Sequence, residues 1–175
     1  MNYEIFGGFE IPRKPNKKSV VDARDLSTFW KDKVDAAHPN LSSAFGCYVF
    51  ALRKRGGGVI PWYVGKTSTQ GFNKECFTYH KRVYYNEVIA DGHGIPLMYL
   101  VARTTRSGKL SASAPAREAK FLESTLIGMA LNRNQDLKNV THATFLKQLH
   151  VPGLINPKKG AQPRHVREFT SMLNA

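Results

Sequence analysis

Residues 45–65 read Phe-Gly-Cys-Tyr-Val-Phe-Ala-Leu-Arg-Lys-Arg-Gly-Gly-Gly-Val-Ile-Pro-Trp-Tyr-Val-Gly. Residues 45–52 and 59–65 are short, apolar and rich in aromatic and β-branched side chains, which is typical of β-strands. The intervening residues 53–58 are three cations followed by three glycines, and this composition indicates a turn. The stretch therefore predicts a β-hairpin, and Pro61, which has no N–H to donate, favours an edge position or a strand start.

A symmetric hairpin around the loop 53–58 places Tyr48 directly opposite Tyr63, provided that no bulge shifts the register. Directly opposed residues have Cβ atoms about 5 Å apart on one face of the ribbon. Lys66 follows the second strand immediately, where a loop can expose it. Cross-strand aromatic pairs are also ordinary stabilisers, so the hairpin alone does not separate packing from chemistry.

The remaining patterns predict an α+β fold. Residues 95–103 are a third apolar strand, and residues 1–19, with paired glycines and two prolines, indicate an irregular arm. Helical patterns span 20–37, 77–90, 115–131 and 139–150, with a final helix in the tail. We therefore expect a small antiparallel sheet of about three strands flanked by helices, with an N-terminal helical extension.

Glu123 stands out because it lies on an otherwise apolar helix face. Ala119 and Ile127 lie one turn before and one turn after it, at i−4 and i+4. A buried carboxylate is costly unless it is paired or binds a metal. A salt bridge, a place at the solvated edge of the stripe, or a role as metal ligand would each satisfy it.

The acidic residues are too sparse for a two-metal site. Residues 45–175 contain only seven Asp and Glu, without a DxD pair, and the six histidines show no HxxxH or HExxH spacing. This pattern favours one hard cation, Mg²⁺ or Mn²⁺, held by few protein oxygens and completed by water and phosphate.

The charge indicates a polyanionic partner. The 175 residues carry 26 Lys and Arg against 13 Asp and Glu, for a net charge of +13. Residues 1–44 contribute seven basic and six acidic residues, so almost all of the excess lies in residues 45–175. A basic domain of this kind points to nucleic acid, either DNA or RNA, although a soluble basic protein without such a role has the same composition.

The cellular compartment is inferred from the lack of membrane-span, signal-peptide and disulfide patterns in the sequence. No run of about eighteen apolar residues predicts a membrane span, and the N-terminus lacks the layout of a signal peptide. The two cysteines, Cys47 and Cys76, form no CxxC motif, and Cys47 lies in an apolar strand. We therefore expect reduced thiols, a cytoplasmic protein and no membrane partner.

Gly46-Cys47-Tyr48, Tyr63-Val64-Gly65 and the downstream Phe-Leu-Glu-x-x-Leu-Ile segment that carries Glu123 resemble the GIY-YIG nuclease family, over roughly residues 45–140. The resemblance implies a small sheet flanked by helices that cleaves a phosphodiester bond with one divalent metal. It implies that Glu123 is the metal ligand, that Tyr48 lies at the attacking water as base or orienting group, and that Tyr63 hydrogen-bonds in the same pocket.

The sequence departs from the family where an Arg-x-x-x-His or Arg-x-x-x-Tyr pattern is usual. Counted back from His80, Cys76 occupies the place of the arginine. Lys74 with His80 is the favoured substitute, followed by Lys81 and then Arg82. Of three asparagines that compete for the family position after the glutamate helix, Asn139 fits best; the other two are Asn132 and Asn134.

The cations have two expected roles. Lys66 and Lys74 supply positive charge to the phosphate, and His80 relays a proton or contacts the phosphate. Backbone contacts to nucleic acid are expected from Arg53, Lys54, Arg55, Lys81, Arg82, Lys158 and Lys159, with Arg164 and Arg167 as further candidates. No helix-turn-helix or zinc-finger pattern indicates sequence reading.

The sequence thus predicts a metal-dependent endonuclease that hydrolyses DNA. It predicts an arm and support helix (1–44), a nuclease core (45–140) and a basic C-terminal extension packed on that core (141–175). The main alternative is a catalytically inactive nucleic-acid-binding module on the same fold. A third is a basic protein-interaction domain that uses the helix over 20–37.

Overall fold

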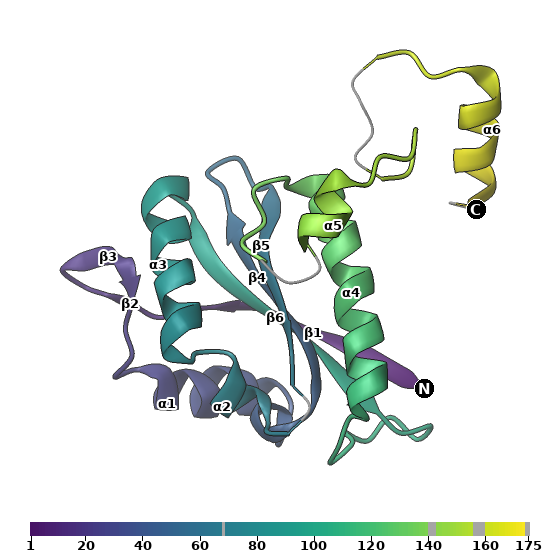
Figure 1. The fold of residues 1–175 in the computed structure, drawn as a ribbon. Coiled ribbons are helices and arrows are strands. Elements are labelled where there is room, and N and C mark those ends of the chain that lie inside the picture. Colours follow the sequence, from purple (N-terminus) through teal and green to yellow (C-terminus); the bar gives the residue numbers. More distant parts are fainter. Residues whose placement is uncertain (68, 140–142, 156–159, 174–175) are drawn as a thin grey trace.

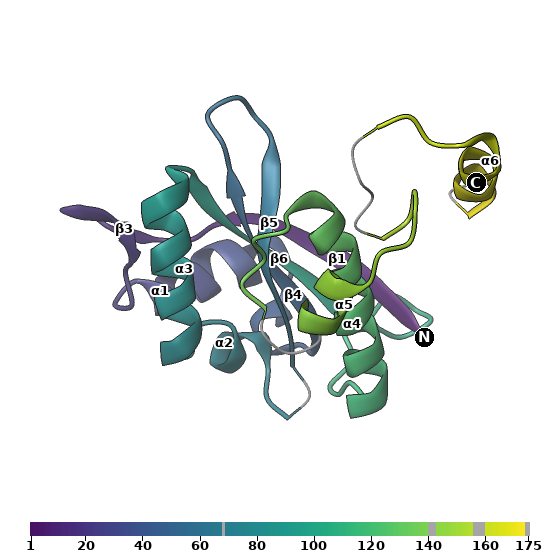
Figure 2. The same cartoon turned by 45° about the horizontal axis from the view of Figure 1, so that its top comes forward.

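The computed structural model describes residues 1–67, 69–139, 143–155 and 160–173. Its centre is an antiparallel sheet of four strands in the order β1-β6-β4-β5 (Figures 1 and 2). The strands span Asn2–Glu10 (β1), Gly46–Arg53 (β4), Val59–Lys66 (β5) and Ile95–Thr104 (β6). Helices flank the sheet, so the expected α+β class is confirmed, whereas the sheet has one strand more than expected.

The additional strand is β1, and the irregular arm predicted for residues 1–19 is wrong. Asn2 pairs with Thr104 of β6, and the register shifts between Gly7 and Phe9. The glycine pair that suggested irregular chain forms this bulge, and the bulge interrupts the apolar alternation by which a strand is recognised. A two-stranded ribbon follows, made of β2 (Arg13–Lys14) and β3 (Lys17–Val21).

The helix predicted over 20–37 starts later than expected, because Lys17–Val21 belong to β3. It begins as α1 (Leu26–Thr28) and continues as the π-helix η1 (Phe29–Asp35), followed by the 3₁₀ turn η2 (Leu41–Ser43). Phe29, Trp30 and Val34 are buried in the main core. The segment therefore supports the sheet.

Two long helices cover opposite faces of the sheet (Figures 1 and 2). On one face α2 (Phe72–Glu75) and α3 (Tyr79–Gly92) pack on the main core, to which Tyr48, Phe50 and Tyr85 belong. On the other face α4 (Ala116–Arg133) packs through Ile127 on Val64 of β5. No helix in the described ranges has the length and apolar content needed to cross a membrane.

The C-terminal segment carries two further helices, α5 (Ala143–Gln148) and α6 (Arg164–Leu173). The α6 helix contains no buried residue and stands apart from the sheet in both ribbon views. The predicted nuclease-core residues lie on β4, β5, α2, α3 and α4, except Asn139, which follows α4. Of these elements, β4, α3 and α4 contact the edge strand β5.

Candidate active site

The hairpin pairs in a different register from the predicted one. Tyr48 lies opposite Gly65, and Phe50 lies opposite Tyr63. Two one-residue shifts produce this register. Arg53 pairs with Val59 at the turn, so the loop is one residue shorter on that side, and β5 contains one extra residue, Trp62, between the partners of Phe50 and Ala51. The prediction that Tyr48 directly opposes Tyr63 is therefore wrong. The two phenols nevertheless share a face as diagonal neighbours, with ring centroids 6.2 Å apart.

The two motif glycines are required by the close packing of the strands. A Cβ on Gly65 would lie 2.3 Å from both Cζ and Oη of Tyr48, so the phenol end of Tyr48 rests directly on this glycine. Gly46 has φ 153°, and a Cβ there would meet the carbonyl oxygen of Val101 at 2.0 Å. The hairpin is thus built so that Tyr48 reaches across β5.

We expect Gly65→Ala to destabilise the fold by about 3 kcal/mol, because a methyl group overlaps the Tyr48 ring in a packed core. Gly128→Ala is the matched control. Gly128 lies inside α4 with nothing within 4 Å of its Cβ position, so alanine there should stabilise the helix by about 1 kcal/mol. Denaturant unfolding measures both changes, and a Gly65→Ala protein as stable as wild type would contradict the packing of Tyr48 on Gly65.

Tyr48 is fully buried, and its hydroxyl forms no hydrogen bond of normal geometry with a described residue, although the Tyr63 hydroxyl lies close enough to interact with it. Burial raises the pKa of Tyr48 well above its usual value near 10. Burial, and then the Glu123 carboxylate, raise the pKa of Tyr63 to about 12. Both phenols therefore keep their protons at neutral pH and can donate hydrogen bonds.

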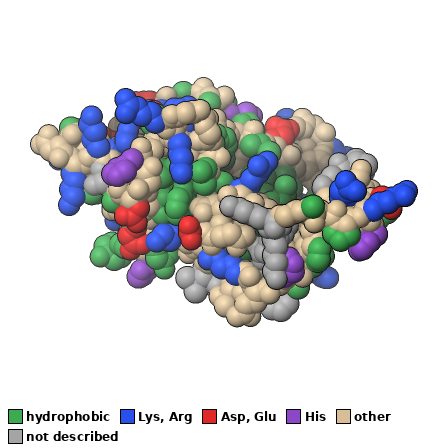
Figure 3. Space-filling model, turned by 90° about the horizontal axis from the view of Figure 1, so that it is seen from above, with side chains coloured by type: hydrophobic (Ala, Val, Ile, Leu, Met, Phe, Trp, Pro, Cys, Tyr) green, Lys and Arg blue, Asp and Glu red, His purple; other side chains and the backbone are tan. Residues whose placement is uncertain are grey.

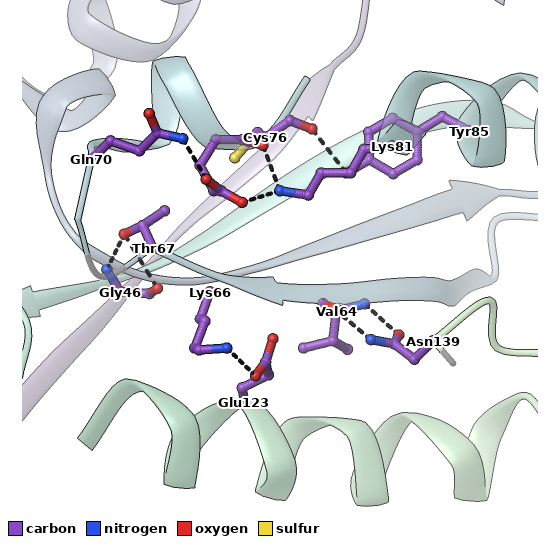
Figure 4. Close-up of polar contacts among 11 residues, drawn as sticks. Gly46, Val64, Lys66, Thr67, Gln70, Cys76, Lys81, Tyr85, Glu123 and Asn139 are labelled. Atoms are coloured by element: carbon purple, nitrogen blue, oxygen red, sulfur yellow. Dashed lines mark hydrogen bonds and ion pairs between the residues drawn. The ribbon is translucent and has the colours of Figure 1, made fainter. Parts of the chain in front are cut away.

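Glu123 faces Lys66 between α4 and β5 (Figure 4). The phenols belong to the main core on the other side of β5. Lys66 Nζ is 2.9 Å from Glu123 Oε2, and the Glu123 side chain is only 12% exposed. Of the three environments that would satisfy this carboxylate, the structure displays the salt bridge. Burial raises the pKa of the neighbouring Cys47 thiol to about 12, with Glu123 as the second cause, so Cys47 is an inert core residue.

Among the cations predicted near the phenols, the structure brings Lys81 to Tyr48. Its Nζ is 5.4 Å from the centre of the Tyr48 ring, within the range of a cation–π contact. It also pairs with the Glu75 carboxylate and donates to the Glu75 carbonyl oxygen at 2.7 Å. Gln70 Nε2 donates to the other Glu75 oxygen at 2.5 Å, so Lys81 is held in place (Figure 4).

The other substitutes for the family arginine lie differently. The Lys74 and His80 residues are exposed, and the His80 ring packs edge-on against Tyr79 with ring centroids 5.7 Å apart. The Nε atom of Arg82 is buried and has no partner in the described part of the chain. Among the described residues, Lys81 therefore contacts Tyr48, and no such contact supports the preference for Lys74 with His80.

Two residues that the sequence reading missed border the phenols. Tyr84 lies on α3 one turn after His80, and its ring is 6.3 Å from that of Tyr63. His80 and Tyr84 are four residues apart, a spacing that places both on one helix face. This spacing could have identified Tyr84 from the sequence. No sequence pattern pointed to Glu75, because Glu75 and Lys81 lie on two different helices, α2 and α3, joined by a short loop.

Asn139 covers the outer edge of β5. Its Oδ1 accepts from the Val64 N–H at 2.9 Å and its Nδ2 donates to the Val64 carbonyl at 2.7 Å (Figure 4). The Asn134 amide binds the Pro61 carbonyl at 2.8 Å, and the Lys138 N–H binds the Trp62 carbonyl at 2.9 Å. Residues 134–139 therefore cover the middle of this edge strand, from Pro61 to Val64.

The expected nucleic-acid contacts form no single cluster. Arg53, Lys54 and Arg55 are exposed at the hairpin tip. The view from above in Figure 3 shows Lys and Arg side chains predominating over Asp and Glu on that face. Lys158 and Lys159 lie outside the described residues, and Arg164 and Arg167 are exposed on α6.

A single hard cation fits Glu123, whereas a site with several protein ligands does not. No three His, Cys, Asp or Glu residues gather in the described ranges to hold a metal ion. In those same ranges Lys66 engages Oε2 of Glu123, while Oε1 has no hydrogen-bond partner. One carboxylate with an available oxygen suits Mg²⁺, which retains most of its water and needs few protein ligands.

Comparison of the chain with family models, with curated proteins and with solved structures finds no match. The functional interpretation therefore rests on the geometry around β5.

Proposed function

We propose that this chain is a GIY-YIG-type endonuclease that hydrolyses phosphodiester bonds in DNA with one divalent cation. The observation that supports this most directly is the Tyr48 hydroxyl, which is buried, forms no hydrogen bond of normal geometry with a described residue and lies on Gly65. Glu123 approaches the next residue, Lys66, from α4. A polar group left unsatisfied in a core is costly and requires an explanation, and a catalytic role is one such explanation. The net charge of +13 supports a polyanionic substrate.

The raised pKa values favour hydrogen-bond donation over base catalysis for the phenols. In this proposal Tyr48 and the less buried Tyr63 orient the attacking water, and Tyr63 donates to a phosphate oxygen. Lys81 stays beside Tyr48 because Glu75 holds it, and it adds positive charge on that side of β5. Lys66 supplies positive charge to the phosphate.

Glu123 is the residue that would hold the cation, through the carboxylate oxygen that Lys66 does not engage. When bound there, a divalent cation supplies charge stabilisation to the phosphate and the leaving oxygen. The position of Glu123 on a rigid 18-residue helix keeps that charge at the end of β5.

Supercoiled plasmid is the first test. We expect the purified protein to nick or linearise it with Mg²⁺ or Mn²⁺, and we expect EDTA to stop the reaction. Gel electrophoresis of matched reactions with and without EDTA measures the effect. A protein that leaves both DNA and RNA intact with either metal, at low salt, would contradict the proposal.

An inactive nucleic-acid-binding module is the second candidate, and one observation favours it. Lys66 already neutralises Glu123. This alternative predicts salt-sensitive DNA binding that survives Glu123→Ala, with no cleavage by either protein. Binding measured by fluorescence anisotropy over a salt series, beside the plasmid assay, separates the two functions.

A further inference from the structure

The side chains of Lys66 and Glu123 extend from β5 and α4, respectively, and point toward one another (Figure 4). Their charged atoms are 2.9 Å apart, and the side chains are 32% and 12% exposed, respectively. The carboxylate is thus shielded from water, while the lysine retains a path to solvent. A divalent cation that binds Glu123 must share the carboxylate with this ammonium group or displace it.

We propose that Lys66 is a displaceable counterion. It neutralises Glu123 while the cation is absent, leaves the carboxylate when a divalent cation binds, and then contacts the substrate phosphate. This inference rests on the proposed function, because it concerns the same carboxylate. Lys66 then has two successive partners, Glu123 and the phosphate. Its contact with Glu123 keeps the cation affinity of the free protein low.

The surroundings of Glu123 explain why a counterion is needed. The residue lies on α4 between the buried Ala119 and Ile127. An unpaired carboxylate at such a position destabilises the fold or takes up a proton. The lysine keeps the carboxylate charged and paired until the cation arrives.

The chemistry of lysine suits a partner that must leave. Its ammonium is a compact charge on a flexible stem, whereas a guanidinium forms several bonds at fixed angles. Glu118, on the same helix as Glu123, is paired with an arginine and allows a direct comparison. Arg103 binds Glu118 at 3.0 Å and also binds the Ser111 hydroxyl at 2.9 Å, so it is held from two sides. In the described part of the chain Lys66 has one anchor, Glu123.

Binding of Mn²⁺ alone, measured by electron paramagnetic resonance or calorimetry, tests this without reference to cleavage. We expect Lys66→Met to bind Mn²⁺ about tenfold more tightly than wild type, since a positive charge a few ångströms from the cation is removed. Lys138→Met is the matched control. Lys138 is 34% exposed and pairs with Glu87 at 3.3 Å, and its removal should leave the Mn²⁺ affinity unchanged.

Glu123→Gln distinguishes failure of the proposed metal site from failure of the counterion role alone. If Glu123→Gln binds Mn²⁺ as well as wild type does, the cation does not use Glu123, and the metal site of the proposed function fails together with this inference. If Glu123→Gln loses the binding while Lys66→Met gains none, only the counterion role is overturned. Circular dichroism checks the fold, and Lys66→Gln, with the same expected tightening, replaces Lys66→Met if the latter does not fold.

Discussion

Replacing Glu123 with glutamine is expected to lower the rate of plasmid cleavage by about 10³-fold or more. Glutamine keeps the shape of the side chain and its place between α4 and β5, but it removes the charge that holds a cation. The lost partner of Lys66 costs little, because that ammonium is a third exposed and water replaces the carboxylate. We therefore expect the free energy of unfolding to fall by only about 1 kcal/mol.

Glu118→Gln is the matched control for this experiment. Glu118 lies on the same helix, is 18% exposed and is paired with Arg103, so its substitution removes a comparable salt bridge. We expect a similar loss of stability with cleavage unchanged. Equal cleavage by wild type and Glu123→Gln, or equal losses in both variants, would show that Glu123 serves the fold alone.

The hairpin and the Glu123 position could be predicted because both depend on local pattern. A glycine-rich turn between two aromatic strands is visible within 21 residues, and the apolar stripe of α4 has helical spacing. The strand β1 could not be predicted in this way. Its partner, β6, begins at Ile95, and pairing over such a separation leaves no mark in a local window.

The neighbours of Tyr48 could not be predicted, because they depend on the exact register of the hairpin. Two one-residue shifts move Tyr63 from its predicted place opposite Tyr48 to a place opposite Phe50: Arg53 already pairs with Val59 at the turn, and Trp62 is an extra residue in β5. On the helix side, α3 begins at Tyr79, whereas the pattern predicted a start at 77. The cation that meets Tyr48 could not be chosen from helical spacing, because Lys81 is placed by its contacts with Glu75 of α2.

Tyr48→Phe is expected to give opposite effects on activity and on stability. The hydroxyl is buried without a hydrogen bond of normal geometry to a described residue, so its removal should raise the free energy of unfolding by about 1 kcal/mol or leave it unchanged. In the proposed function the same hydroxyl orients the attacking water. Its loss should therefore lower cleavage by about 10²-fold to 10³-fold.

Tyr85→Phe is the control that makes this comparison informative. Tyr85 is equally buried on the same side of the sheet and stacks on Phe50, but its hydroxyl donates to the Cys76 carbonyl at 3.0 Å. Removing that bond should cost about 1 kcal/mol and leave cleavage unchanged. A stable, inactive Tyr48→Phe beside a less stable, active Tyr85→Phe would distinguish a hydroxyl kept for chemistry from one kept for packing. A Tyr48→Phe protein that cleaves like wild type would remove Tyr48 from the mechanism, because only the phenolic oxygen differs between the two proteins.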